Sequence, residues 1–271
     1  MRKSSKYLAV AGLTATLCSG ALALPIIWVG DSDGTLGTVD VSTGGATVIG
    51  QMSQSMTDIA FDPTGNLWGI TTDSLYQINK TTAATTLVGN YGAPALNSLI
   101  FGANGTLYAA GSSLYKLDTA TGAAALIGNG GGYSSSGDLA FVGGNLYLSS
   151  FGDDLFMLNR TTGAGTKVGA IGYSAVYGLA TDNNIDLYGL TGTNILDINA
   201  TTGAGNVRVN YAGTALGAAW GSAFLSEAGG GGGSVPEPST IALLGLGLAG
   251  LWVTRRRHTR SLDLAPKPEA A

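Results

Sequence analysis

The chain has 271 residues, of which 11% are charged and 8% are aromatic, and its formal net charge is −4. Its 44 glycines lie well above the average share of about 7%, yet they lack the three-residue period that collagen requires. The mean hydropathy of +0.25 excludes a chain kept disordered by charge.

The N-terminus has the three parts of a secretory signal peptide. Three basic residues lie within the first six positions, an apolar run covers 8–17, and small residues surround Ala21 and Ala23. This pattern predicts a signal peptide over 1–23 that is cleaved after Ala23. The only cysteine, Cys18, lies inside it, so the exported part is expected to fold without a disulfide.

The middle of the chain repeats about every forty residues. One element has an apolar residue, then Asp or Asn, then a Thr-Gly or related pair, and later an apolar pair and usually glycine. It begins at Val39, Ile78, Leu117, Leu158 and Ile198. Two further elements share this spacing, so each unit holds four short apolar runs separated by turn residues. Such runs are typical of β-strands.

A four-stranded antiparallel unit of this length is typical of a β-propeller blade. In the second unit the expected strands are 58–61, 66–70, 75–78 and 85–88. Residues 24–228 are long enough for five blades, so we expect an all-β, five-bladed β-propeller over that range. The repeated region begins with the second strand of a blade, near Ile26. The first strand of the same blade is expected at 217–220, where it would complete the blade, close the ring and leave no open sheet edge. A solenoid is the alternative architecture, but it would need distinct end caps.

The composition of the middle excludes several classes of chemistry. The only histidine, His258, lies beyond the repeats, which removes histidine-based nucleophiles and histidine metal ligands from the domain. Residues 25–228 hold five basic and 14 acidic side chains. Such an acidic surface disfavours nucleic acid, whose binding depends on neutralising phosphates. We expect no cofactor and no metal.

Two aspartates are candidates for a site on the axis of the ring. Asp58 and Asp138 begin matching strands two blades apart, and both are expected to face the central channel. Paired carboxyl groups cleave glycosidic bonds, so a carbohydrate-active enzyme is one interpretation, although it is based on analogy of fold. In the other, each aspartate accepts hydrogen bonds from backbone amides. The sequence at Asp31 and Asp33 fits part of a calcium loop or an ordinary hairpin turn.

A tyrosine recurs in the loops between blades, and these loops are expected to share one face of the ring. Rings there could stack on sugars or contact a protein partner, or each could pack between neighbouring blades. The candidate ligand-binding residues are Tyr91, Tyr133, Tyr173 and Tyr211, together with Asp58 and Asp138. Three Asn-x-Thr patterns, at Asn79, Asn159 and Asn199, occupy the same repeat position, which predicts a turn.

The C-terminal part begins with a glycine-rich linker over 229–234. An apolar stretch follows, predicted as a transmembrane segment over 239–254, then a cytoplasmic tail over 258–271. The short motifs that flank the apolar stretch are Pro236-Glu237-Pro238 before it and Arg255-Arg256-Arg257 after it. Basic residues at the end of such a stretch mark its cytoplasmic side.

In this order and spacing, residues 235–257 resemble the PEP-CTERM sorting signal of Gram-negative bacteria. The resemblance implies recognition by an exosortase, a membrane cysteine protease that removes the tail near the Pro-Glu-Pro element. It also implies an association with extracellular polysaccharide. The extension over 258–271 departs from the usual pattern, because these tails generally stop soon after the basic cluster.

We therefore expect an exported protein that is anchored in the inner membrane before processing and then reaches the cell surface or the extracellular matrix. The expected role is non-catalytic binding of polysaccharide or of an envelope protein. The two alternatives are a carbohydrate-active enzyme that uses Asp58 and Asp138, and a purely structural matrix protein.

Overall fold

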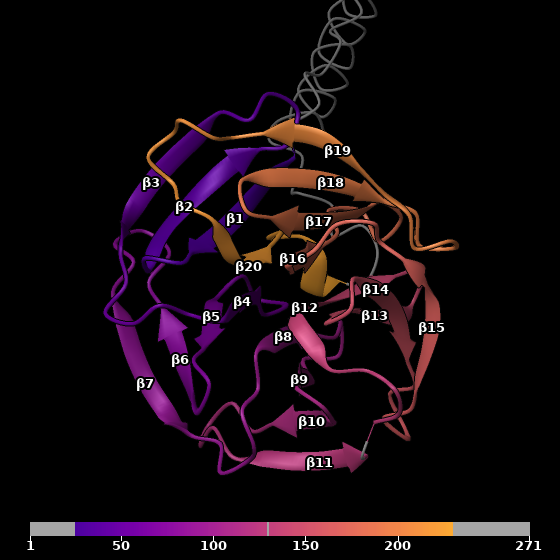
Figure 1. Cartoon of the computed structure of the whole chain (residues 1–271). Helices are drawn as coiled ribbons and strands as arrows, with labels where there is room; N and C mark the ends of the chain where they lie inside the picture. Colours follow the sequence, from indigo (N-terminus) through magenta and orange to yellow (C-terminus); the bar gives the residue numbers. More distant parts are fainter. Residues whose placement is uncertain (1–24, 129, 230–271) are drawn as a thin grey trace, which may run out of the picture.

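A computed structural model describes residues 25–128 and 130–229. In that part of the chain, twenty strands form five four-stranded sheets that surround a central axis as the blades of a propeller (Figure 1). The sequence prediction of an all-β, five-bladed propeller is confirmed. The predicted signal peptide, transmembrane segment and sorting motif lie outside the described residues.

The blades follow one another around the ring, and the strands of each blade are named below in order from the axis outward. Blade 1 comprises β20 (Ala219–Ala223), β1 (Ile26–Asp31), β2 (Thr35–Asp40) and β3 (Ala46–Gln51). Blade 2 comprises β4 (Asp58–Phe61), β5 (Leu67–Ile70), β6 (Ser74–Ile78) and β7 (Thr85–Asn90). Blade 3 comprises β8 (Ser98–Phe101), β9 (Leu107–Ala110), β10 (Leu114–Leu117) and β11 (Ala124–Gly128). Blade 4 comprises β12 (Ser135–Val142), β13 (Asn145–Ser150), β14 (Asp154–Leu158) and β15 (Gly165–Ala170). Blade 5 comprises β16 (Val176–Ala180), β17 (Leu187–Thr191), β18 (Asn194–Ile198) and β19 (Gly205–Asn210). A short 3-10 helix, η1 (Glu227–Gly229), follows β20.

The repeated Asn-x-Thr patterns form the turn between the third and fourth strands of a blade. The Asn159 side chain accepts hydrogen bonds from the N–H groups of Thr161 at 2.9 Å and Thr162 at 3.1 Å. Asn79 and Asn199 repeat this arrangement. The predicted turn is confirmed, and the asparagine side chain accepts hydrogen bonds there in addition to those that its own backbone carbonyl accepts.

The glycine that ends the repeat element lets neighbouring blades approach closely at the rim. A methyl group at Gly169 of β15 would overlap the Thr202 carbonyl oxygen in the next blade. Gly89 and Gly128 approach Thr121 and Thr162 of their next blades in the same way. The recurring glycine of the repeat therefore reflects a contact between neighbouring blades, whereas the apolar runs reflect the strands within each blade.

Aromatic pairs join the blades nearer the axis. An aromatic residue in the second strand of one blade meets a phenylalanine at the end of the first strand of the next. The pairs are Trp28–Phe61, Trp68–Phe101, Tyr108–Phe141 and Tyr188–Phe224, with ring centroids 5.3–6.0 Å apart. Between blades 4 and 5 the phenylalanine position holds Thr181, and no aromatic pair forms there.

The ring closes through β20, but at a different register from the one that the sequence predicted. The predicted strand at 217–220 is wrong, because β20 runs from Ala219 to Ala223. Ala223 pairs with Trp28, as Ala60 pairs with Trp68 in blade 2. Phe224 is therefore the counterpart of Phe61, and Gly217 lies in the preceding loop. In the sequence Trp220 resembles this phenylalanine, but its indole lies at the surface with 36% of its area exposed.

Candidate functional site

Two carboxyl groups meet in the buried centre of the ring. Asp58 is fully buried and accepts hydrogen bonds from the N–H groups of Ile59, in its own blade, and Leu99, in the next blade, at 2.7 and 2.6 Å. Its carboxyl group also interacts with that of Asp138. The aspartate thus connects blades 2 and 3 and contacts blade 4.

Asp138 connects blades 4 and 5 in the same way. It accepts hydrogen bonds from the Leu139 and Leu179 N–H groups, both at 2.6 Å, and from the Ser222 hydroxyl of blade 1 at 3.1 Å. The strand glycine Gly221 packs against Asp58 so closely that an added methyl group would overlap it. These contacts fill the centre of the ring and hold it together.

A third carboxyl group lies buried beyond the ends of the inner strands. Glu227 of η1 accepts hydrogen bonds from the N–H groups of Thr181 and Phe224, both at 3.3 Å. Thr181 follows β16 and Phe224 follows β20, so Glu227 ties η1 to the ends of two inner strands. We call this end of the ring the bottom face, and the end where the inner strands begin the top face.

Burial raises the pKa of all three groups, and the charge of Asp138 adds to this effect at the other two. Removal from water is the main cause at Asp58, whose pKa rises well above its usual value, and the Asp138 charge raises it further. Burial also raises the pKa of Asp138, although the hydrogen bonds that it accepts oppose this effect. Burial and the Asp138 charge raise the pKa of Glu227. Because both pKa values are raised and the two groups interact, the dyad as a unit keeps a proton to higher pH than an exposed aspartate does.

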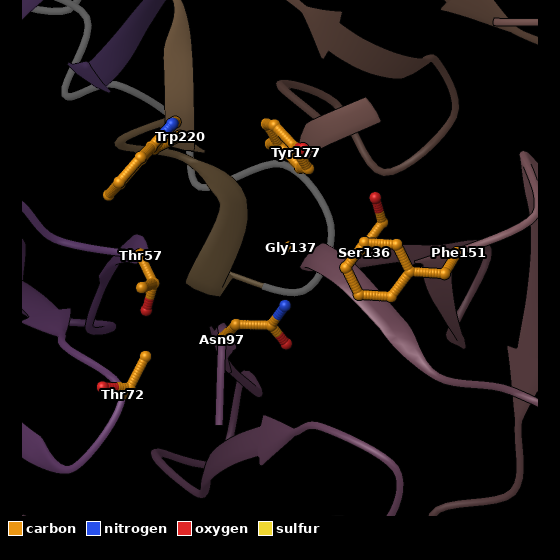
Figure 2. Close-up of a pocket in the computed structure, with 8 residues that line it drawn as sticks. All are labelled: Thr57, Thr72, Asn97, Ser136, Gly137, Phe151, Tyr177 and Trp220. Atoms are coloured by element: carbon orange, nitrogen blue, oxygen red, sulfur yellow. The ribbon is translucent and has the colours of Figure 1, made fainter. Parts of the chain in front are cut away.

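The top face carries a pocket of about 250 Å³ around the start of the inner strands. Its wall is mostly carbon, and all of its lining residues are uncharged. Figure 2 shows them: Thr57, Thr72, Asn97, Ser136, Gly137, Phe151, Tyr177 and Trp220. They come from the inner strands or from loops at the same end of all five blades.

Three aromatic side chains give the pocket its apolar surface. Phe151 lies in the loop after β13 with 61% of its area exposed, Trp220 lies in β20 at 36%, and Tyr177 of β16 is partly buried. Figure 2 shows that the three come from different segments and stand around the same space as Asn97. The Asn97 amide donates to the Ser135 carbonyl at 3.0 Å, whereas its oxygen has no hydrogen-bond partner among the described residues.

The tyrosines predicted as ligand-binding residues are mostly packed between blades. Tyr91, Tyr133 and Tyr211 are 3%, 6% and 1% exposed, and Tyr173 packs partly buried against the core of blades 4 and 5. The hydroxyl group of Tyr91 donates to the Thr71 carbonyl at 2.7 Å, and that of Tyr211 to the Gly192 and Gly217 carbonyls at 3.2 Å. Tyr133 donates to the Gly163 carbonyl, and burial raises its pKa to about 12. The burial of Tyr91, Tyr133 and Tyr211 agrees with the alternative in which each ring packs between neighbouring blades.

The predicted carboxylate candidates are also placed by the structure. Asp58 and Asp138 do face the axis, as predicted, but they are 0% and 1% exposed and line none of the described pockets. Asp31 is buried, and its carboxylate accepts hydrogen bonds from the N–H groups of Asp33, Thr35 and Gly217. Asp31 therefore organises the hairpin turn and fixes the loop before β20. Within 25–128 and 130–229, no three His, Cys, Asp or Glu residues cluster as metal ligands.

Sequence reasoning missed the pocket residues because they do not recur. Tyr177 and Trp220 occupy the same position of the repeat, but Thr57, Asn97 and Gly137 hold that position in the other blades, so no residue type recurs there. Phe151 likewise corresponds to Thr72 of blade 2. The sequence offers one signal for Phe151, Tyr177 and Trp220: each is an aromatic residue that the repeat pattern does not explain.

Comparisons with known proteins identify the C-terminal motif and support the fold. Residues 234–257 match the PEP-CTERM protein-sorting motif. No curated protein matches the chain. A solved structure of a protein of unknown function from Bacteroides thetaiotaomicron VPI-5482 is 13% identical, with a TM-score of 0.52, over 76% of this chain and 63% of that one. A chain of a nidogen/laminin complex is 12% identical, with a TM-score of 0.50, over 75% of this chain and 82% of that one.

These likenesses concern the fold, because the identities are far below those that carry an activity. The motif itself implies export, processing by an exosortase and sorting to the cell surface. No helix among residues 25–128 and 130–229 is long and apolar enough to cross a membrane. The chain is a five-bladed β-propeller that carries a PEP-CTERM sorting motif at its C-terminal end.

Proposed function

We propose that this protein is a non-catalytic binding propeller of the cell surface or extracellular matrix, and that it binds polysaccharide in the pocket of its top face. The observation that carries the proposal is the combination of three aromatic side chains with uncharged polar groups around one pocket. Aromatic faces pack against the apolar faces of sugar rings, and amide and hydroxyl groups bind their hydroxyls. The export and surface sorting that the motif implies would bring the domain to such polymers.

The charge of the pocket favours a neutral or weakly charged glycan over other ligands. Its lining has neither the basic residues that phosphate or nucleic acid needs nor the clustered carboxylates that calcium needs. The uncharged Asn97 and Ser136 lie beside Tyr177 in the lining. The unpaired oxygen of Asn97 supplies an acceptor for a sugar hydroxyl, once a side-chain movement exposes it.

The burial of Asp58 and Asp138 supports a non-catalytic role. A glycosidase needs both carboxyl groups at the scissile bond with room for the sugar, whereas here both are enclosed by backbone amides of two blades. If the enzymatic alternative were correct, Asp58→Asn and Asp138→Asn would abolish hydrolysis of a polymer that the native chain degrades. In the proposal, the native chain degrades none.

The test is binding of residues 24–229 to the producing cell's own polysaccharide and to a glycan array. Trp220→Ala and Tyr177→Ala should each weaken binding at least about tenfold, as for a residue at the centre of an interface. Met157→Ala is the matched control, because Met157 is exposed to the same extent as Trp220, at 37%, and lies outside the pocket. Equal losses in all three variants, or binding of a protein alone, would overturn the proposal. Absence of any saturable binding would favour the structural matrix alternative.

A further inference from the structure

The described chain ends at a fixed point on the bottom face. After β20, the Ser226 hydroxyl donates to the Asp182 carbonyl at 2.7 Å, and Glu227 accepts from the Thr181 and Phe224 N–H groups. Ala228 is fully buried and packs with the core of blades 2 and 3. Helix η1 also contacts β4 and β8. The segment therefore crosses beneath the inner strands, and the chain leaves the propeller near its axis.

The pocket lies at the opposite end of the same inner strands. Thr57 and Asn97 immediately precede β4 and β8, while Thr181, which holds η1, immediately follows β16. Because all five inner strands run in the same direction around the axis, their starts share one face and their ends share the other. The buried carboxyl groups and the packed strand glycines occupy the space between the two faces.

The sequence between the propeller and the predicted transmembrane segment is short compared with the propeller itself. Residues 230–238 can span at most about 32 Å when fully extended. A domain of this size has a radius of gyration of about 17 Å, which corresponds to a sphere of about 21 Å radius and a path of about 65 Å from one pole to the other. A tether that starts at the bottom pole is therefore too short to let the top pole touch the membrane.

We infer that the bottom face is the attachment face and that the top face, with its aromatic pocket, points away from the membrane for as long as the sorting motif anchors the chain. The partner would thus be met from outside, and an extended polymer could reach the pocket without entering the gap between the domain and the lipid. The inference uses the anchoring in the proposed function, but it is independent of which ligand binds.

Accessibility of engineered cysteines in the full chain tests this orientation. Cys18→Ser supplies a background without cysteine. Thr72→Cys places a thiol at the pocket on the top face, and Ile185→Cys places one in the exposed loop after β16 on the bottom face. The chain is produced in a Gram-negative host without an exosortase, and spheroplasts are treated with a small membrane-impermeant maleimide or with a bulky polyethylene-glycol maleimide.

The bulky reagent should label Thr72→Cys at least about fivefold faster than Ile185→Cys, after each rate is divided by the rate of the small reagent. Detergent extraction should remove this difference. Insertion of about thirty Gly/Ser residues after Gly231 should also remove most of it, because the full extension of the tether would then exceed the half-perimeter of the domain and the domain could turn over. Equal normalised rates on the membrane, or a faster bottom thiol, would overturn the inference, as would recovery of the unprocessed chain outside the membrane fraction.

The outcome is separable from that of the binding test. Loss of glycan binding in every assay would leave the ratio of the two labelling rates unchanged. Equal labelling rates of the two thiols together with intact glycan binding would support the pocket but reject the proposed orientation.

Discussion

Asp58 and Asp138 lie in inner strands two blades apart, yet their carboxyl groups interact in the buried centre of the ring. Each also accepts an amide hydrogen bond from the next blade, at Leu99 and Leu179. With the Ser222 hydroxyl of blade 1, which donates to Asp138, the pair joins all five blades. It does so with groups whose charges burial disfavours. This arrangement makes the stability of the propeller depend on pH.

The unfolding free energy should decrease as the pH rises from 5 to 8. An unfolded aspartate has a pKa of about 3.9, and the folded pKa of both groups is raised. The stabilisation is therefore complete below the unfolded pKa and is lost as the pH rises through the folded values. Each proton released on unfolding contributes a slope of up to about 1.4 kcal/mol per pH unit. Urea unfolding at several pH values measures this slope.

Asp58→Asn should flatten that profile, because asparagine does not titrate, while it lowers stability at every pH by losing one of the two amide hydrogen bonds. Asp118→Asn is the control: its side chain is exposed, hydrogen bonds lower its pKa, and the substitution should leave the slope between pH 5 and 8 unchanged. A native profile that rises with pH over this range would contradict the assignment of raised pKa values to the dyad.

The ring closure of blade 1 can be tested at Phe224. Its ring meets that of Tyr188 at 5.3 Å and is 2% exposed, so Phe224→Ala should cost about 3–4 kcal/mol of unfolding free energy. Trp220→Ala should cost far less, about 1 kcal/mol or below. Chemical unfolding of the two variants distinguishes the observed register from the predicted strand at 217–220. With the predicted strand, Trp220→Ala would cause the larger loss of unfolding free energy and Phe224→Ala the smaller one.

The fold could be predicted because its signals are local and occur five times. The turn at Asn159, the strands around it and the glycine at Gly169 each follow from the residue types at fixed spacing. The register of β20 could not, because its strand pairs with β1 at the other end of the sequence and Trp220 imitates the expected phenylalanine. The pocket could not, because Phe151, Tyr177 and Trp220 converge only after the ring closes. The tyrosines that recur at the position of Tyr91 mostly pack between blades. Tyr177 and Trp220 share a repeat position whose residue type varies between the blades, and this variable position lines the pocket.

The Asn-x-Thr turns should behave as structural elements. Asn159→Ala removes two hydrogen bonds to the Thr161 and Thr162 N–H groups in an exposed turn, and we expect a loss of about 1 kcal/mol in unfolding free energy. Asn159→Asp should retain most of the stability, because Asp118 makes the same pair of hydrogen bonds in blade 3. Equal losses for both substitutions would show that the amide nitrogen of Asn159, and not its oxygen, matters in the turn.

The close approach of blades at the rim should tolerate no side chain at its glycine. A methyl group at Gly169 would overlap the Thr202 carbonyl oxygen, and both groups are backbone or backbone-attached atoms that cannot rotate away. Gly169→Ala should therefore lower the unfolding free energy by about 2–3 kcal/mol, as other overpacked sites do. Gly131→Ala is the matched control, because a methyl group there meets nothing closer than 3.9 Å and the backbone is not in the left-handed region. Thermal and urea unfolding of the two variants measure the difference, and an unperturbed Gly169→Ala protein would mean that blades 4 and 5 are not in contact along the outer rim.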